Sequence, residues 1–143
     1  MHPFDIKDAV LAKHAQHVVI IHFPIALFIT GAVFDYLGQF FARPALRSAA
    51  EFNFLAAAFS APIAVMTGLL AWHFQLEGQH LRGVLLLHFL LGTTSAALIV
   101  FVWWTHRRGR SVPVAIRLLL EAAAVAVIGL TGHLGGFLSG VNT

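Results

Sequence analysis

Four long apolar segments, separated by short polar stretches, make up most of the chain. They cover residues 18–42, 52–76, 83–105 and 118–138. Each is close to the roughly 20 residues that a helix needs to cross about 30 Å of hydrocarbon. The segments do not alternate between apolar and polar residues with a period of two, and a membrane barrel needs many more strands than four. The pattern therefore predicts four transmembrane helices.

The connectors between these segments are short, at residues 43–51, 77–82 and 106–117. Because short connectors make neighbouring helices antiparallel, we expect an all-α fold, a four-helix transmembrane bundle with up-down-up-down order. We expect this bundle to form a single transmembrane domain from residues 1–143. Residues 1–17 are polar and lack the apolar run and cleavage pattern of a signal peptide, so we expect the first span to be a retained anchor.

The composition agrees with a membrane protein. Of the 143 residues, 59% are hydrophobic and 10% are charged, and the mean hydropathy is +0.83. A soluble domain carries charge on roughly a quarter of its residues. The absence of cysteine excludes disulfides, thiolate-bound zinc, iron–sulfur clusters and covalent haem attachment. Any metal bound here must therefore have nitrogen or oxygen ligands.

The basic residues indicate the orientation of the bundle. One side carries Arg43, Arg47, Arg107, Arg108, Arg110 and Arg117, and the side of both termini carries Lys7, Lys13 and Arg82. By the positive-inside rule, the arginine-rich connectors are cytoplasmic and both termini lie on the outer side. We expect a multi-pass protein of a bacterial inner membrane. The isoelectric point near 10.2 arises from these short clusters, so we expect no nucleic-acid partner.

Histidine is the unusual feature, with nine copies in a chain that has few polar residues. Most of the histidines in or next to the spans belong to the outer side, and His106 belongs to the inner side. His22, His88 and His133 each lie about five residues inside a segment, which places them about 6–8 Å below the outer boundary at 1.5 Å per residue. Three helices thus present imidazole at one depth, where ionisable groups are costly and usually functional.

Imidazoles at matched depth on facing helices can hold a b-type haem between them. We expect His22 and His88 as the axial pair, with His133 as a substitute ligand. At 100° per residue, His17 lies about 140° from His22 around the helix, so the two cannot easily bind one ion. We therefore expect His17 to support the site or to line its entrance.

Small residues near these histidines leave room for a flat macrocycle, and Gly92 and Gly132 are the candidates that contact the cofactor. Three alternatives remain. Three or four imidazoles also suit copper or zinc, as in a metal-binding or transport protein, and the layer also suits a quinone head group. Alternatively, no cofactor binds, and the chain is an accessory subunit whose small-residue faces dock into a larger membrane complex.

Polar residues also lie near the inner span ends. Asp35, Asn53 and Glu121 fall there, and Arg117 precedes Glu121 by four residues. Such groups can relay protons, but i,i+4 pairing and snorkelling at the interface explain them better. Motifs of hydrolases, kinases and nucleotide-binding proteins are missing from the sequence. We therefore expect electron transfer rather than independent catalysis.

One segment of the first span resembles a known family. Residues 22–27 read His-Phe-Pro-Ile-Ala-Leu, and His17 precedes them by five residues. Further matching features are Gly68-x-x-x-Trp72, His88 at the start of the third span, and the pair Gly135 and Gly136 at the end of the fourth. Over nearly the whole chain, the sequence resembles the bacterial membrane family labelled domain of unknown function 2231.

The resemblance implies a four-helix integral membrane protein, of a kind often fused or adjacent to cytochromes c and Rieske-type domains. It implies that His17, His22 and His88 are typical of the family. The chain departs from the family pattern at Val18, where a proline is expected, and at Phe137, where an acidic residue often follows the glycine pair. We expect a membrane electron-transfer protein or redox-complex subunit whose partners are lipid, an external redox protein, a quinone or a larger complex.

Overall fold

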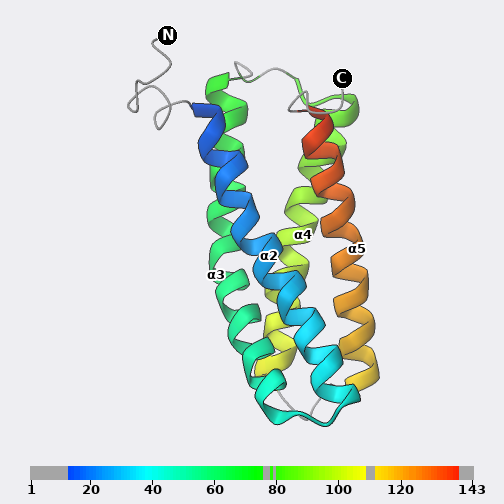
Figure 1. Cartoon of the computed structure of the whole chain (residues 1–143). Helices are drawn as coiled ribbons and strands as arrows, with labels where there is room; N and C mark the ends of the chain where they lie inside the picture. Colours follow the sequence, from blue (N-terminus) through cyan, green and yellow to red (C-terminus); the bar gives the residue numbers. More distant parts are fainter. Residues whose placement is uncertain (1–12, 76–77, 79, 109–111, 139–143) are drawn as a thin grey trace.

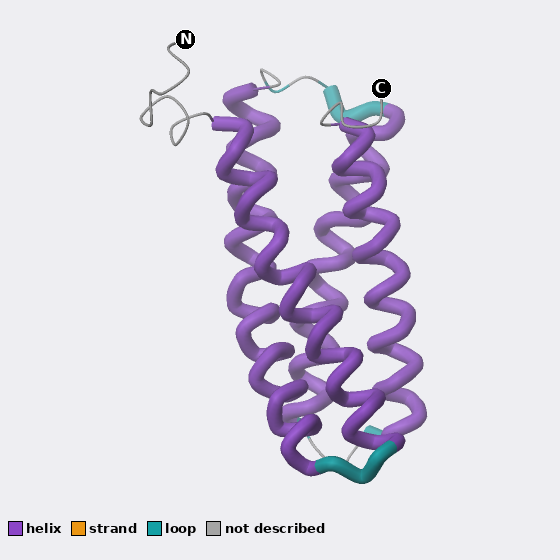
Figure 2. Tube along the Cα trace, viewed as in Figure 1, coloured by secondary structure: helices purple, strands orange, loops and turns teal. Residues whose placement is uncertain are grey.

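The computed structural model describes residues 13–75, 78, 80–108 and 112–138. Its helices are α2 (Lys13–Phe40), α3 (Pro44–Gln75), α4 (Gly83–Arg107) and α5 (Val114–Leu138). They run side by side in alternating directions and form an elongated bundle (Figure 1). The described part of the chain is helical apart from short turns (Figure 2).

All four helices are long and apolar enough to cross a membrane, which confirms the expected four-helix fold. Helix α3 begins at Pro44, eight residues before the expected start of its span. Proline suits the first turn of a helix because its missing N–H has no partner there in any case. The charged residues that follow Pro44 therefore belong to α3 and not to a connector.

The two ends of the bundle differ in their polar residues. The end with the α2–α3 and α4–α5 connections, here called the arginine-rich end, carries Arg43, Arg47, Arg107, Arg108 and Arg117. The opposite end, here called the histidine end, carries His17, His22, His73, His80, His88 and His133. The first residues of α2 and the last residues of α5 lie at the histidine end (Figure 1).

The apolar core occupies the middle of the bundle and its arginine-rich half. Phe28 of α2 and Phe54 of α3 are fully buried, with ring centroids 5.3 Å apart. A Cβ on Gly31 would lie 3.0 Å from the Phe54 ring, so glycine allows α2 to approach α3 closely. The hydroxyl of Tyr36 donates a hydrogen bond of 2.6 Å to the carbonyl of Leu118, which joins α2 to α5. The most extensive packing is between α2 and α3, and α4 packs to similar extents against α5 and α3.

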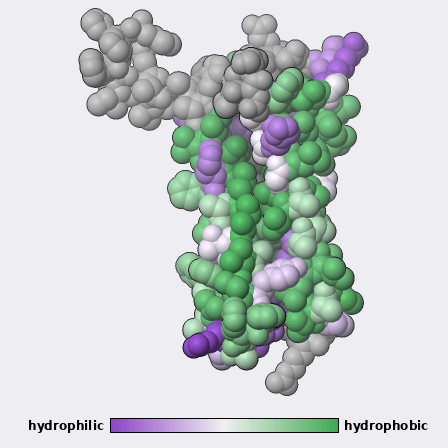
Figure 3. Space-filling view, turned by 45° about the vertical axis from the view of Figure 1, so that its right-hand side comes forward, coloured by the Kyte–Doolittle hydropathy of each residue, from purple (hydrophilic) through white to green (hydrophobic). Residues whose placement is uncertain are grey.

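Large apolar side chains cover the outside of the bundle (Figure 3). Phe40 is 83% exposed, Leu119 69% and Phe52 67%. A soluble monomer rarely exposes continuous apolar patches of such extent. Lipid is the solvent in which this surface is stable.

The turn between α2 and α3 contains a strained residue. Ala42 has a φ of 51°, in the left-handed region. The N–H of Arg43 donates to the carbonyl of Gly38 at 2.9 Å, and the N–H of Ala42 donates to the carbonyl of Gln39 at 3.4 Å. These two bonds form a Schellman motif with Ala42 at the position that glycine usually occupies.

Replacing Ala42 with glycine should stabilise the protein. The left-handed conformation costs a residue with a Cβ about 1–2 kcal/mol, and the added chain entropy of glycine offsets about 0.5–1 kcal/mol of that gain. We expect Ala42→Gly to raise the thermal midpoint in detergent by roughly 1–4 °C. Ala122→Gly, at an exposed position inside α5, is the control and should lower the midpoint. A lower midpoint for Ala42→Gly would contradict the assignment of strain to this turn.

Candidate functional site

Polar side chains lie inside the bundle at two levels. The first cluster, near the histidine end, contains His17, Thr67, His88, Ser95 and Thr131. The second cluster, near the arginine-rich end, contains Asp35, Gln39, His106, Arg117 and Glu121. Helical phase places one member of each cluster on the same face of a helix. His17 and Asp35 on α2, like His88 and His106 on α4, are eighteen residues apart, which is about five turns.

The ring of His17 is held by α3. Its Nδ1 lies 3.0 Å from Oγ1 of Thr67, and that hydroxyl donates its own proton to the carbonyl of Ala64 at 2.9 Å. When the Thr67 proton is on that carbonyl, Nδ1 of His17 is the donor in this pair. The ring rests on Gly68, where a Cβ would lie 3.0 Å from its Cε1 atom. In this arrangement the neutral ring has hydrogen on Nδ1 and a free lone pair on Nε2.

The ring of His88 is held by α5 in the same manner. Its Nδ1 lies 3.2 Å from the carbonyl oxygen of Thr131, which can only accept. The ring rests on Gly135, where a Cβ would lie 3.1 Å from its Cε1 atom. The Thr131 hydroxyl lies 2.8 Å from the carbonyl of Val127 and 3.0 Å from Oγ of Ser95, and either hydroxyl can donate in the bond with Ser95. Because the Thr131 carbonyl only accepts, Nδ1 of His88 carries the hydrogen in its bond.

The two histidines lie at the same end of the bundle, on α2 and α4, and both rings are half-buried. Neither Nε2 atom has a hydrogen-bond partner among the described residues. The arrangement presents two neutral imidazole nitrogens, from α2 and from α4, in the interior of the bundle. Such nitrogens are ligands for a metal ion or a haem iron.

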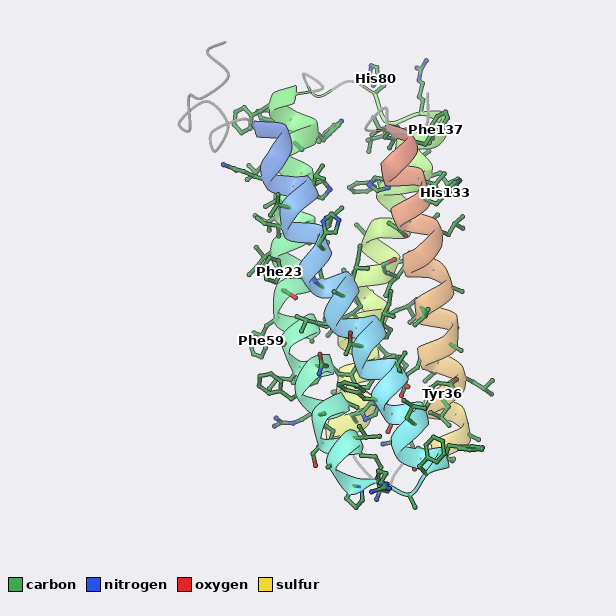
Figure 4. All side chains as sticks on the ribbon, in the orientation of Figure 1. Phe23, Tyr36, Phe59, His80, His133 and Phe137 are labelled. Carbon is green, nitrogen blue, oxygen red and sulfur yellow. The ribbon has the colours of Figure 1, made fainter. Side chains whose placement is uncertain are left out.

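The other expected ligands lie elsewhere. His22 is exposed, and its Nδ1 bonds to the carbonyl of Val18 on its own helix. His133 is exposed on the side of α5 that faces away from α2 and α3 (Figure 4). A Cβ on Gly132 would meet nothing within 4 Å, and one on Gly92 would make only an ordinary contact with the Thr131 methyl group at 3.9 Å. The structure therefore does not bring His22 or His133 towards His88.

The second cluster is more deeply buried. Nε2 of His106 lies 2.9 Å from Oε1 of Glu121 and 3.9 Å from Oδ2 of Asp35. Asp35 is 2% exposed, His106 8% and Glu121 0%. Nη2 of Arg117 lies 3.7 Å from Oδ2 of Asp35, and Gln39 donates to the other oxygen of Asp35 at 3.1 Å. The three ionisable groups around His106 thus come from α2 and α5.

This geometry corrects the interpretation of the inner polar residues as pairs at the membrane interface. Glu121 bonds to His106 of α4 rather than to Arg117, and Arg117 pairs with Asp35 of α2. In the sequence, His106 is distinguished only as the one histidine assigned to the inner side. Its spacing of eighteen residues from His88 could have indicated that it faces the interior, because this spacing places both histidines on one helix face.

Four transmembrane helices with two clusters of polar side chains in the interior define a multi-pass integral membrane protein. The family of predicted membrane proteins labelled DUF2231 matches residues 13–141, and the chain belongs to this family. No curated protein and no solved structure shows significant similarity to the chain.

Proposed function

We propose that the protein is an electron-transfer protein, or a subunit of a redox complex, that binds one b-type haem near the histidine end with His17 and His88 as axial ligands. The observation that carries this proposal is the matched setting of the two rings, each held through Nδ1 by a neighbouring helix, with Nε2 left without a partner. The proposal keeps the haem expected from the sequence and replaces His22 with His17.

The chemistry of the donor set fits a haem. Haem iron accepts neutral imidazole nitrogens, and a ligating histidine almost always donates its other N–H to a carbonyl or hydroxyl that fixes the ring. Thr67 and the carbonyl of Thr131 are such acceptors. Glycines beneath both rings allow each imidazole to lie close to the helix behind it. When bound, the haem supplies one-electron transfer, and the chain supplies orientation and an apolar surround.

The electron partners follow from the location of the pair. The pair lies near the histidine end, which the positive-inside rule assigns to the outer side of a bacterial inner membrane. A donor or acceptor on that side is an external redox protein of the cytochrome c or Rieske type, or a quinone in the outer leaflet. Docking into a larger membrane complex is compatible with the same role.

Substitution of the histidines separates the possible ligand pairs. We expect the purified wild-type protein, produced with abundant haem, to show a low-spin b-type spectrum in a reduced-minus-oxidised difference. His17→Ala and His88→Ala should each abolish that spectrum or convert it to a high-spin form, because each removes one axial bond. His22→Ala and His133→Ala are the matched controls and should keep it unaltered.

Three other outcomes would contradict the assignment of His17 and His88 as haem ligands. Loss of the low-spin spectrum in His22→Ala with retention in His17→Ala would restore His22 as the partner of His88. A wild-type protein that binds no haem but holds copper or zinc through these histidines would make the layer a metal site. Binding of neither haem nor metal at the histidine end would leave the accessory-subunit function.

Removing the hydrogen bond between His17 and Thr67 tests whether the residues that hold the rings tune the haem. Thr67→Val keeps the shape of the side chain and removes the acceptor for Nδ1 of His17. An imidazole without this bond is a poorer electron donor to iron. We expect the variant to retain haem and to show a higher midpoint potential in a redox titration. An unchanged potential would exclude His17 as a ligand held in this way.

The proposed orientation is testable because the chain has no cysteine of its own. We expect Val112→Cys, in the α4–α5 connection, to react with a membrane-impermeant maleimide only after the membrane is opened. His80→Cys, between α3 and α4, should react in intact spheroplasts. The reason is the excess of arginine at the arginine-rich end. The reverse labelling pattern would place the histidine pair at the cytoplasmic side.

A further inference from the structure

The buried cluster at the arginine-rich end has no part in the proposed haem site. We propose that Asp35, His106 and Glu121 bind one divalent transition-metal ion inside the bundle. The ligands are Nε2 of His106 and one carboxylate oxygen from each acid. They come from α2, α4 and α5, so the ion would join three helices at this end.

The distances among the three groups suit a metal site. One ligand atom from each residue lies within 4.8 Å of the other two. Around a zinc ion with bonds of about 2.0–2.2 Å, ligand atoms lie about 3–3.5 Å from one another. The separations of 2.9 Å from His106 to Glu121 and 3.9 Å from His106 to Asp35 lie on either side of this range. Small side-chain movements would therefore complete the ligand set.

Unpartnered oxygen atoms provide the second observation. Oδ2 of Asp35 and Oε2 of Glu121 are buried and accept no hydrogen bond among the described residues. A buried acceptor without a partner costs about 1–3 kcal/mol, and more when it is charged. Arg117, at 3.7 Å from Asp35, is too far to satisfy Oδ2 by a hydrogen bond. A metal ion between the acids would compensate both oxygens.

The sum of the charges at this site would allow one further, anionic ligand on the metal ion. Two carboxylates and the Arg117 guanidinium sum to one negative charge when His106 is neutral. A dication changes the sum to one positive charge, and a bound hydroxide or another small anion would bring it to zero. A pocket of about 280 Å³ reaches Asp35 and His106 and is also lined by Arg47 and Arg117. Glu51 also lines this pocket and offsets the charge of Arg47, so Arg117 is the group that favours an anion in the remaining position.

The ligand types narrow the choice of metal. One imidazole with two carboxylates suits zinc, manganese and ferrous iron. Calcium and magnesium prefer all-oxygen sites, and Cu(I) prefers sulfur. The arrangement without a metal is the hydrogen bond of His106 with Glu121 beside Asp35, and this is the competing outcome of the test.

Zinc binding to the full-length protein decides between these two arrangements. The protein carries a purification tag without histidine, is treated with EDTA in detergent, and is equilibrated with micromolar ZnCl₂ before desalting and elemental analysis. We expect about one zinc per chain in the wild type. Asp35→Asn, His106→Gln and Glu121→Gln should each weaken binding at least tenfold. His80→Ala, which removes an exposed histidine outside the cluster, should keep full occupancy.

Thermal unfolding keeps the test independent of expression level and of the haem. Zinc should raise the midpoint of the wild type and of His80→Ala, because a ligand of the folded state stabilises it by mass action. Zinc should not raise the midpoint of Asp35→Asn, whose near-identical shape preserves the fold. The proposal would be overturned if the folded wild type bound no zinc after equilibration. It would also be overturned if Asp35→Asn and His106→Gln bound zinc as fully as the wild type. EDTA should leave the haem spectrum unchanged, so the two sites can fail separately.

Discussion

Lipid around the bundle favours an inward orientation for ionisable side chains that lie deep in the spans. A polar group exposed to hydrocarbon loses the hydrogen bonds that water would supply, and a charge loses far more. The helices therefore rotate about their axes until Asp35, His88, Ser95 and Glu121 face inwards. The apolar side chains, among them Phe40, then cover the outside. Both candidate sites follow from this one constraint on helix rotation.

In both helix pairs, a histidine ring is held against the neighbouring helix by a glycine and a hydrogen bond. In α2–α3, His17 rests on Gly68 and shares a hydrogen bond with Thr67. In α4–α5, His88 rests on Gly135 and donates to a carbonyl of the partner helix. The two pairs pack side by side, mainly through α3 and α4. A cofactor held by both histidines would join the two pairs at the histidine end.

The two clusters lie at opposite ends of the bundle. Eighteen residues of helix separate His17 from Asp35 and His88 from His106, a rise of about 27 Å. That length is close to the thickness of the hydrocarbon core. The apolar core around Phe28 and Phe54 lies between the two clusters. The proposed haem and the proposed metal ion would therefore act near different membrane surfaces.

The sequence by itself determined the four spans, their antiparallel order and the family, because hydrophobic length and connector length are local properties of the chain. It also determined which residue types were available, so cysteine chemistry was excluded and imidazole chemistry favoured. The tertiary structure decided which histidines face each other. The depth of a residue along a helix follows from counting residues, and depth alone favoured His22 and His133 as haem ligands.

Orientation around the helix depends on which faces pack together, and the structure turns those two histidines towards lipid. Likewise, the bond from His106 to Glu121 joins α4 to α5, and no local sequence pattern specifies that pairing. Only packing of all four helices placed Asp35 beside that pair.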